Sequence, residues 1–451
     1  MRLNVRNAPA ALALQFLAFV AAGIAVAFPS LSYPWHGDDL HLIRTFSAGE
    51  LAFVWHHNWD LDGVETMGYR PLTVLFNHAR AWLFGEAVMA HRLFLIGLYA
   101  TYLVIIGAVA RRFGLSRIAM TLAGVMILCA KYSGYHFVWI SDGVHIAQGL
   151  LFALAALAIL RWVESGAPGW YGASIAAALL SVLVREDSLG VLPVLIVMAG
   201  VHSWQSGQWK PQRAGLVGYA AVLAAISAAT LLVRQTIVSG LVAPPSTRSD
   251  EVLAYILEMV TLAGWQPRLW MAVFIGVLAL ALLVVRRLER PNSRMAWLWL
   301  FFAVVAGSPG LVETRVNLLF FPITFYCIFL AQVVVRLANQ PAVPGATWNK
   351  PAAVTLVLVC VLIPARESRL QQLSMAPGSI MHLEVSCNVA LDGEWSRVTP
   401  PAKRALIEQE LSRLHMDRQA CEALLDESQS APGERALPAG VFAPSRRFLT
   451  R

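Results

Sequence analysis

The sequence predicts an all-α polytopic membrane protein (about 11 transmembrane helices) with a small α/β segment at its C-terminus. Three observations support this fold class. Of 451 residues, 57% are hydrophobic and only 14% are charged, whereas a soluble domain carries about 25% charged residues. The mean hydropathy is +0.60. Most of the chain before residue 366 consists of apolar runs of membrane-spanning length.

The first apolar run extends from Ala8 to Phe28, after the basic start MRLNVRNAPA. At about 20 residues it is longer than a signal-peptide core, so we expect an uncleaved first transmembrane helix. A signal cleaved within 21–27 is the alternative. Further spans are expected near 88–110, 118–138, 144–161, 170–184, 188–202, 214–236, 268–288, 295–311, 317–336 and 352–365.

The charges of the connections predict the orientation of these spans. An odd number of spans places the two termini on opposite sides. One set of connections is rich in Arg and Lys, as in 111–117 and 286–294, and the opposite set carries the carboxylates, as in 185–187 and 250–258. Because basic connections stay in the cytoplasm, we expect a cytoplasmic N-terminus, an external first loop at 30–87 and an external C-terminal tail.

The first loop gathers charged and imidazole side chains next to the membrane. Such groups are costly beside a bilayer, which makes the cluster a functional-site hypothesis. Asp38 and Asp39 follow directly on the first span. A carboxylate there could act as a base toward a hydroxyl acceptor or bind a cation, and the alternative is ordinary helix capping. The loop also contains His36, His41, Arg44, His56, His57, Asp60, Asp62 and Glu65.

Tyr69 and Arg70 precede an amphipathic stretch that begins at Pro71. Arginine presents a planar fork that suits phosphate, and tyrosine is enriched at membrane interfaces. A helix starting at Pro71 would hold Arg70 at the depth of lipid phosphates. The alternative is an arginine that only anchors the loop at the membrane surface.

Three further polar groups interrupt apolar runs on the same predicted face. Arg185, Glu186 and Asp187 separate two short spans and need partners or water; a solvated turn is the alternative. Glu313 and Arg315 form a second interruption, with a self-contained ion pair as the alternative. Asp142 and His145 are candidates for helix capping first and for substrate contact second.

The sequence gives little support for a metal site or for nucleic-acid binding. The loop histidines could contribute a metal site, but His36 and His41 are five residues apart and do not share a helical face. Neither a CxxC pair nor a zinc-like Cys/His spacing occurs. We expect no nucleic-acid binding, because the net charge of +8 is not gathered into basic runs.

The tail, 366–451, is expected to form a small domain outside the membrane. Alternating residues predict a strand over 380–391, helical spacing predicts a helix from Pro401 to Leu414, and 431–451 is expected to be loose. Cys387 and Cys421 could form a disulfide if the tail is exported. The other cysteines, Cys129, Cys327 and Cys360, lie in apolar runs. The tail contains no catalytic motif.

The order of four segments resembles the GT-C superfamily of integral-membrane glycosyltransferases, in particular bacterial YRPL-type members and TMTC-type protein O-mannosyltransferases. The segments are the acidic pair Asp38-Asp39; YRPLTVLFNHARAWLFGEAVMAHRLFLIGLYATYLVIIGAVARRFG at 69–114; REDSLGVLPVL at 185–195; and ETRVNLLFFPITFYCIFLA at 313–331. The resemblance covers most of residues 10–336.

The resemblance implies a GT-C transmembrane domain at 1–365 in the bacterial inner membrane, with its active site in the periplasm. It implies inverting transfer of a sugar from a polyprenyl-phosphate donor to a hydroxyl of an unknown glycan, lipid or protein. No cofactor is certain, although a divalent cation could assist. The implied roles are Asp38 or Asp39 as catalytic base, Arg70, Arg185 and Arg315 at the donor phosphate, and Tyr69, Glu186, Glu313, Asp142 and His145 in support.

Two other functions compete with this hypothesis. The chain could be a non-catalytic subunit that keeps a glycosyltransferase scaffold and presents its tail to a partner complex. A transporter is less favoured, because the ionisable residues lie at one predicted face instead of mid-membrane and we find neither an inverted repeat nor a pair of broken helices.

Overall fold

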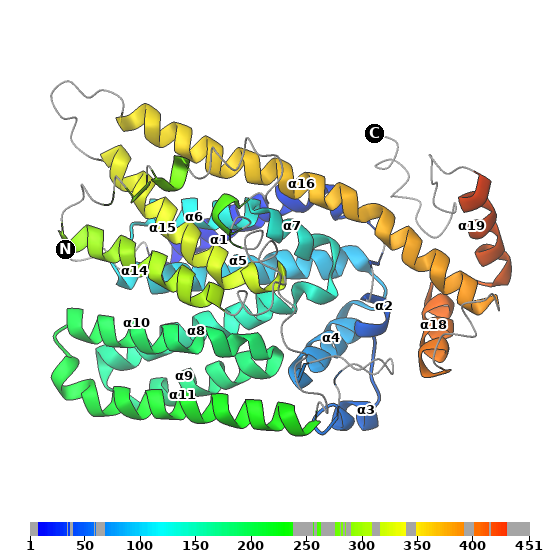
Figure 1. Cartoon of the computed structure of the whole chain (residues 1–451), viewed down its shortest axis with the longest axis horizontal. Helices are drawn as coiled ribbons and strands as arrows, with labels where there is room; N and C mark the ends of the chain where they lie inside the picture. The colour runs from blue at the N-terminus through cyan, green and yellow to red at the C-terminus, as the bar shows by residue number, and fades with distance from the viewer. Residues whose placement is uncertain are drawn as a thin grey trace.

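The computed structural model describes residues 8–33, 35–36, 39–57, 59, 68–237, 256, 259–262, 276–279, 281–282, 285, 290–308, 316–339, 349–391, 401–414 and 416–430 (Figure 1). In this described part every regular element is a helix. The transmembrane helices run roughly alongside one another, and the helices of the first loop and of the tail gather at one end (Figure 1).

Seven described helices are long and apolar enough to cross a membrane. They are α1 (Ala8–Ala27), α5 (Val88–Arg112), α8 (Val144–Ser165), α10 (Leu192–Gln205), α11 (Trp209–Ile237), α15 (Phe320–Asn339) and α16 (Asn349–Ala390). An eighth span is formed if α6 (Arg117–Cys129) and α7 (Lys131–Val138), which are bent by 59° at their junction, cross together. The chain is therefore a multi-pass membrane protein.

Two shorter apolar helices, α9 (Pro168–Val184) and α14 (Arg290–Gly307), coincide with two more of the predicted spans. Most of the predicted span at 268–288 lies outside the described residues. The total of about 11 spans stays a prediction.

Close helix packing forms one core. Helix α8 packs on α9 and α5, and α15 packs on α14 and α6. Small residues allow this approach: a Cβ on Gly149 of α8 would collide with the ring of Phe320 at the start of α15. Within a bilayer such close packing replaces the hydrophobic driving force that holds soluble helices together.

The first loop folds into short helices that stand against the bundle. Helix α2 (Asp39–Leu42) is followed by α3 (Ala48–Phe53), where Ser47 and Glu50 form a reciprocal capping box. Helix α4 (Pro71–Phe84) begins with proline at its first position, as expected for the amphipathic stretch after Arg70. Its contacts with α9 and α5 fix the loop to the bundle.

The predicted strand over 380–391 is wrong. Helix α16 continues without a break from Asn349 to Ala390. Its buried residues Leu383, Ser386 and Cys387 follow helical spacing, while Val385, which a strand would turn inward, is 39% exposed. The predicted division of the chain into two domains at 365/366 falls inside this continuous helix. The division itself stays a prediction.

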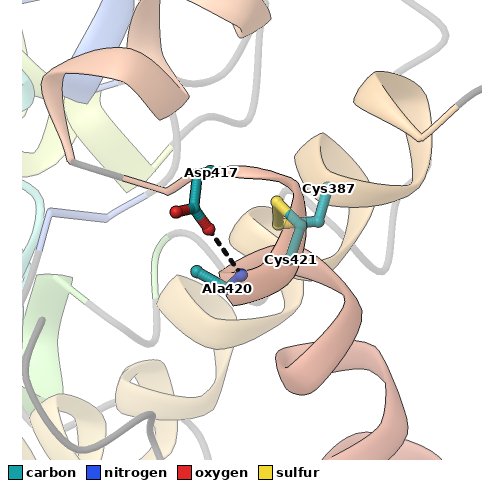
Figure 2. The surroundings of a disulfide bond; sticks show 4 residues. All are labelled: Cys387, Asp417, Ala420 and Cys421. Carbon is teal, nitrogen blue, oxygen red and sulfur yellow. Dashed lines mark hydrogen bonds between the residues drawn. A yellow bond between two sulfur atoms is a disulfide. The ribbon is translucent and has the colours of Figure 1, made fainter.

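The C-terminal helices form a small unit at the far end of α16. Helix α18 (Pro401–Arg413) confirms the predicted helix, and α19 (Arg418–Ser430) follows it. Figure 2 shows the disulfide between Cys387 of α16 and Cys421 of α19, with Cα atoms 5.2 Å apart. Nearby, the carboxylate of Asp417 accepts the N–H of Ala420 and caps α19 (2.8 Å). The predicted loose segment at 431–451 lies outside the described residues.

Candidate active site

Polar side chains from four separate segments meet at one end of the bundle. The 3-10 turns η3 (Ser141–Gly143) and η4 (Glu186–Gly190) lead into α8 and α10, so both turns lie where these helices begin. Helices α2 and α4 of the first loop lie beside the same end (Figure 1). The structure thereby brings together polar groups that are up to about 150 residues apart in the sequence.

Asp142 lies at the centre of this cluster. Its Oδ2 is 3.2 Å from His136 Nδ1, and its Oδ1 is 3.3 Å from His145 Nε2. His136 reaches the site because the chain bends between α6 and α7. Both imidazoles and the carboxylate are buried. One carboxylate thus lies between two imidazoles, each of which has a ring nitrogen directed at a different carboxylate oxygen.

Arg185 joins this group to Asp187. Its Nη1 lies 3.8 Å from Asp142 Oδ1, and its Nε lies 3.4 Å from Asp187 Oδ2. Gln148 of α8 donates to Asp187 Oδ1 and to Ser188 Oγ, the latter at 2.7 Å. Arg185 is only 6% exposed, so its charge is compensated almost entirely by these carboxylates.

Arg70 forms a two-point ion pair with Glu186. Arg70 Nε donates to Glu186 Oε2 (3.1 Å), and Nη2 donates to Oε1 (3.3 Å). Burial alone would lower the pKa of Arg70, but Glu186 and two more distant carboxylates outweigh it and raise that pKa. Gly68 leaves room for the pair, because a Cβ there would lie 2.7 Å from Arg70 Nε. The guanidinium therefore stays charged, with its side chain 16% exposed.

Asp39 ties the first loop to this cluster through backbone hydrogen bonds. Its carboxylate accepts the N–H groups of Ser141 (2.7 Å), His36 (3.0 Å) and Ile140 (3.3 Å). The residue is fully buried. Burial raises the pKa of the Asp39 carboxyl, and the backbone hydrogen bonds from Ser141 and His36 offset only part of this effect. Asp39 thus fixes the backbone immediately before Asp142.

Two buried arginines support the same region. Arg80 of α4 donates to the carbonyl of Ile140 (3.2 Å), and Arg92 of α5 donates to that of Phe137 (2.9 Å) and also to Tyr33. Burial lowers the pKa of Arg80 to about 9, against an opposing effect of the Asp39 carboxylate. The two side chains bind the backbone of the segment directly before η3.

The predicted site residues divide into three groups. Asp39, Arg70, Asp142, His145, Arg185 and Glu186 come together as described. Tyr69 lies apart from these ion pairs: its hydroxyl donates to the carbonyl of Trp55 (3.2 Å) and joins the residues before α4 to those after α3. Asp38, Glu313 and Arg315 lie outside the described residues.

The structure adds residues that the sequence did not single out, namely His136, Gln148, Asp187 as a partner of Arg185, Arg80 and Arg92. His136 and Arg92 are ionisable residues within predicted spans, a signal that would have identified them. Among the described residues, no group of three or more His, Cys, Asp or Glu side chains is arranged to hold a metal ion. His56 and His57 of the first loop are exposed.

Solved structures of ArnT from Cupriavidus metallidurans share this architecture. The apo structure matches with a TM-score of 0.50 and 16% sequence identity, over 92% of this chain and 79% of ArnT. The chain has the GT-C fold. The structure of ArnT bound to undecaprenyl phosphate matches over the same shares, with 16% identity and a TM-score of 0.48. No family model and no curated protein matches the sequence.

The likeness confirms at the level of the fold the GT-C resemblance expected from the sequence. At this end of the bundle the site contains as many carboxyl groups as guanidinium groups. Its carboxylates are Asp39, Asp142, Glu186 and Asp187, and its guanidinium groups are Arg70, Arg80, Arg92 and Arg185. An anion that binds Arg70 or Arg185 must share the guanidinium group with a carboxylate or displace that carboxylate. Of these two arginines, Arg70 is the more exposed.

Proposed function

We propose that the chain is an inverting glycosyltransferase that moves a sugar from a polyprenyl-phosphate donor to an acceptor hydroxyl. The observation that carries the proposal is the meeting of Arg70, Arg185, Asp142 and the Asp39 loop at one end of a GT-C bundle. Such transfer needs a base for the acceptor and cations for the leaving phosphate, both at the membrane surface where the lipid headgroup lies.

Arg70 and Arg185 are our candidates for the donor phosphate, and Arg315 stays a candidate from the sequence. Guanidinium groups bind phosphate through two parallel N–H bonds. Glu186 and Asp187 hold the two forks in place before the donor arrives. On phosphate binding, the lipid oxygens would take over part of the contact that Glu186 now makes with Arg70. ArnT, which shares the fold, has been crystallised with undecaprenyl phosphate.

We assign the base to Asp38 and a positioning role to Asp39. The Asp39 carboxylate is buried and already accepts three backbone N–H groups. A base must reach the proton that it removes, and a carboxylate occupied in this way is better suited to fixing the loop that carries its neighbour. Asp142, with His136 and His145, would stabilise charge beside the leaving group.

We infer that the site faces the periplasm of a bacterial inner membrane, with the N-terminus in the cytoplasm. The Cys387–Cys421 disulfide supports this orientation, because such bonds persist in oxidising compartments. The tail that carries it lies at the same end as the first loop (Figure 1). Arg111 and Arg112 at the other end of α5 agree with a cytoplasmic face.

The test uses cells that lack the gene and are complemented with wild-type protein, Asp38→Asn or Arg70→Ala. Mass spectrometry of the lipid extract should detect a polyprenyl-phosphate-linked sugar that accumulates without the protein and falls with wild type. Both variants should leave the donor accumulated while reaching normal membrane levels. Unchanged donor lipids in all strains would contradict the function. Repeating the purified reaction with EDTA would test whether a divalent cation takes part.

The non-catalytic scaffold remains the second candidate, because α18 of the tail packs on α2, next to Asp39. If the tail bound a partner complex, the contact between α18 and α2 would couple that partner to the conformation of the first loop. Deletion of 392–451 together with Cys387→Ser should then break up a detergent-extracted assembly. An unchanged assembly would reject the scaffold function.

A further inference from the structure

A separate cavity of about 730 Å³ lies at the opposite end of the bundle from the candidate active site. It is lined by residues at the ends of α5, α10 and α15 and at the start of α14. Helices α5, α10 and α15 begin at the active-site end, and α5 alone is about 37 Å long at 1.5 Å per residue. The two sites therefore lie near opposite faces of the membrane.

The cavity is strongly basic. Arg112, Arg294 and Arg336 contribute to its lining. Arg112 is neutralised by Glu164, at 2.8 Å from Nε to Oε1. Within the described part of the chain, neither Arg294 nor Arg336 forms an ion pair. Two guanidinium forks thus face one cavity without a described carboxylate between them, which favours an anion with several oxygen atoms.

The other walls suit a lipid better than a free ion. Val201 and Leu298 provide apolar surface, and Trp204 at the rim is 63% exposed, as is common at membrane interfaces. Gln332 is only 4% exposed, and its Oε1 has no hydrogen-bond partner among the described groups. A headgroup with a hydroxyl would satisfy this acceptor while its phosphate contacts the arginines.

We propose that this cavity binds the headgroup of an anionic glycerophospholipid from the leaflet opposite the candidate active site. The cations, the buried acceptor and the apolar wall match, in order, a phosphate, a headgroup hydroxyl and the start of an acyl chain. Basic pockets between transmembrane helices are a known arrangement for anionic headgroups. An inorganic or sugar phosphate would use the arginines but leave the apolar wall and Trp204 without a partner.

The test is binding to purified full-length protein in a neutral detergent, measured by native mass spectrometry and by thermal stabilisation. The probes are dioctanoyl phosphatidylglycerol, dioctanoyl phosphatidylcholine and glycerol 3-phosphate. The variants are Arg294→Gln/Arg336→Gln and the control Lys210→Gln/Arg213→Gln, which removes two exposed charges near the start of α11. Wild type should prefer the phosphatidylglycerol probe, and the Arg294/Arg336 variant should bind it at least about tenfold more weakly. The control should bind like wild type.

Other outcomes would overturn the proposal. Equal losses in both double variants would indicate general attraction to positive charge. Equal binding of the two lipids would remove the role of the arginines. Glycerol 3-phosphate bound as tightly as the lipid would assign the cavity to a soluble phosphate. If the double variant failed to fold, Arg294→Gln alone would carry the test, because the Arg294 side chain is exposed and its loss should not affect folding.

Discussion

Arg70 and Glu186 form the contact in which stability and phosphate binding compete most directly. Both side chains of their two-point ion pair are largely withdrawn from solvent. Removing one partner leaves the other buried charge without its nearest counter-charge, whereas removing both charges does not. Single and double variants of this pair therefore distinguish a structural role of Arg70 from a role in phosphate binding.

We expect Arg70→Ala and Glu186→Gln each to lower the free energy of unfolding by about 2 kcal/mol. The double variant should lose less than the sum, since the two residues interact. Thermal unfolding in detergent measures this. Additive losses would mean that the two side chains do not stabilise each other.

The buried carboxyl group of Asp39 leads to a prediction about how the stability of the protein depends on pH. Burial raises its pKa above the ordinary 3.8. The folded state thus favours the protonated form, so the stability from this group is complete below 3.8 and is lost as the pH rises through the raised pKa. The Asp39→Asn variant carries no such titration. The melting temperature of wild type, relative to that of the variant, should therefore be higher at about pH 5 than at about pH 8. A difference that is constant or increases with pH would contradict the buried environment.

At single positions the sequence singled out ionisable residues better than it predicted their contacts. Asp39, Arg70 and Arg185 are ionisable residues beside apolar runs. The free-energy cost of placing such groups next to a bilayer identified them as candidates. Their partners depend on which segments meet in space, so the pairing of Arg70 with Glu186, 116 positions later, was not predictable from local pattern. His136 was overlooked although it lies within the predicted span at 118–138, where an ionisable side chain marks a functional site.

Among the elements, the bend between α6 and α7 has the clearest effect on the site. It turns α7 by 59° and brings His136 to Asp142. The close approach of α7 to α16 holds this bend: a Cβ on Gly134 would lie 2.8 Å from the backbone oxygen of Ser368. A backbone atom cannot move aside as a side-chain end can.

We therefore expect Gly134→Ala to lower the free energy of unfolding by about 1–3 kcal/mol through overpacking. The matched control is Gly97→Ala in α5, where a Cβ would meet nothing within 4 Å. That variant should be neutral or stabilising by up to about 1 kcal/mol, because alanine is the better helix former. Thermal unfolding of both variants provides the comparison, and equal effects would contradict the packing between α7 and α16.

The helices with long apolar runs were predictable, because a bilayer demands a minimum length. The strand at 380–391 was not correctly predicted. Alternation of apolar residues over so short a stretch also fits one side of a helix, and the continuation of α16 with its packing on α18 and α19 decided the outcome. The sequence pattern alone does not specify the packing of α16 on α18 and α19.

At the level of the whole molecule, the basic cavity lies at one end of the helix bundle, and the disulfide-linked tail lies at the other end, beside the first loop (Figure 1). The tail packs beside the first loop through α18 and α2, so a change in the tail can reach the loop that carries Asp39. The Cys387–Cys421 bond closes this unit over 34 positions.

We expect Cys387→Ser/Cys421→Ser to destabilise the C-terminal unit by roughly 3–4 kcal/mol, from the loop that the bond closes. Limited proteolysis of membranes should then cut the tail of the variant faster than that of wild type. In wild type, a bulky maleimide should label these two thiols only after denaturation and reduction. Labelling of Cys387 or Cys421 themselves after denaturation without reduction, located by peptide mass spectrometry, would show that the bond is absent and would remove its support for an exported tail. The three free cysteines are labelled after denaturation in either case.

The most direct measurement is binding of a short-chain polyprenyl phosphate to purified protein, with wild type compared with Arg70→Ala, Arg185→Ala and the surface control Arg213→Gln. We predict binding to wild type and to the control, and at least about tenfold weaker binding in both site variants, since each loses a charge-assisted contact to phosphate. Glu186→Gln should keep or strengthen binding, because it frees the fork of Arg70. Absence of binding to well-folded wild type, or equal binding to all variants, would contradict a donor phosphate site at this end of the bundle.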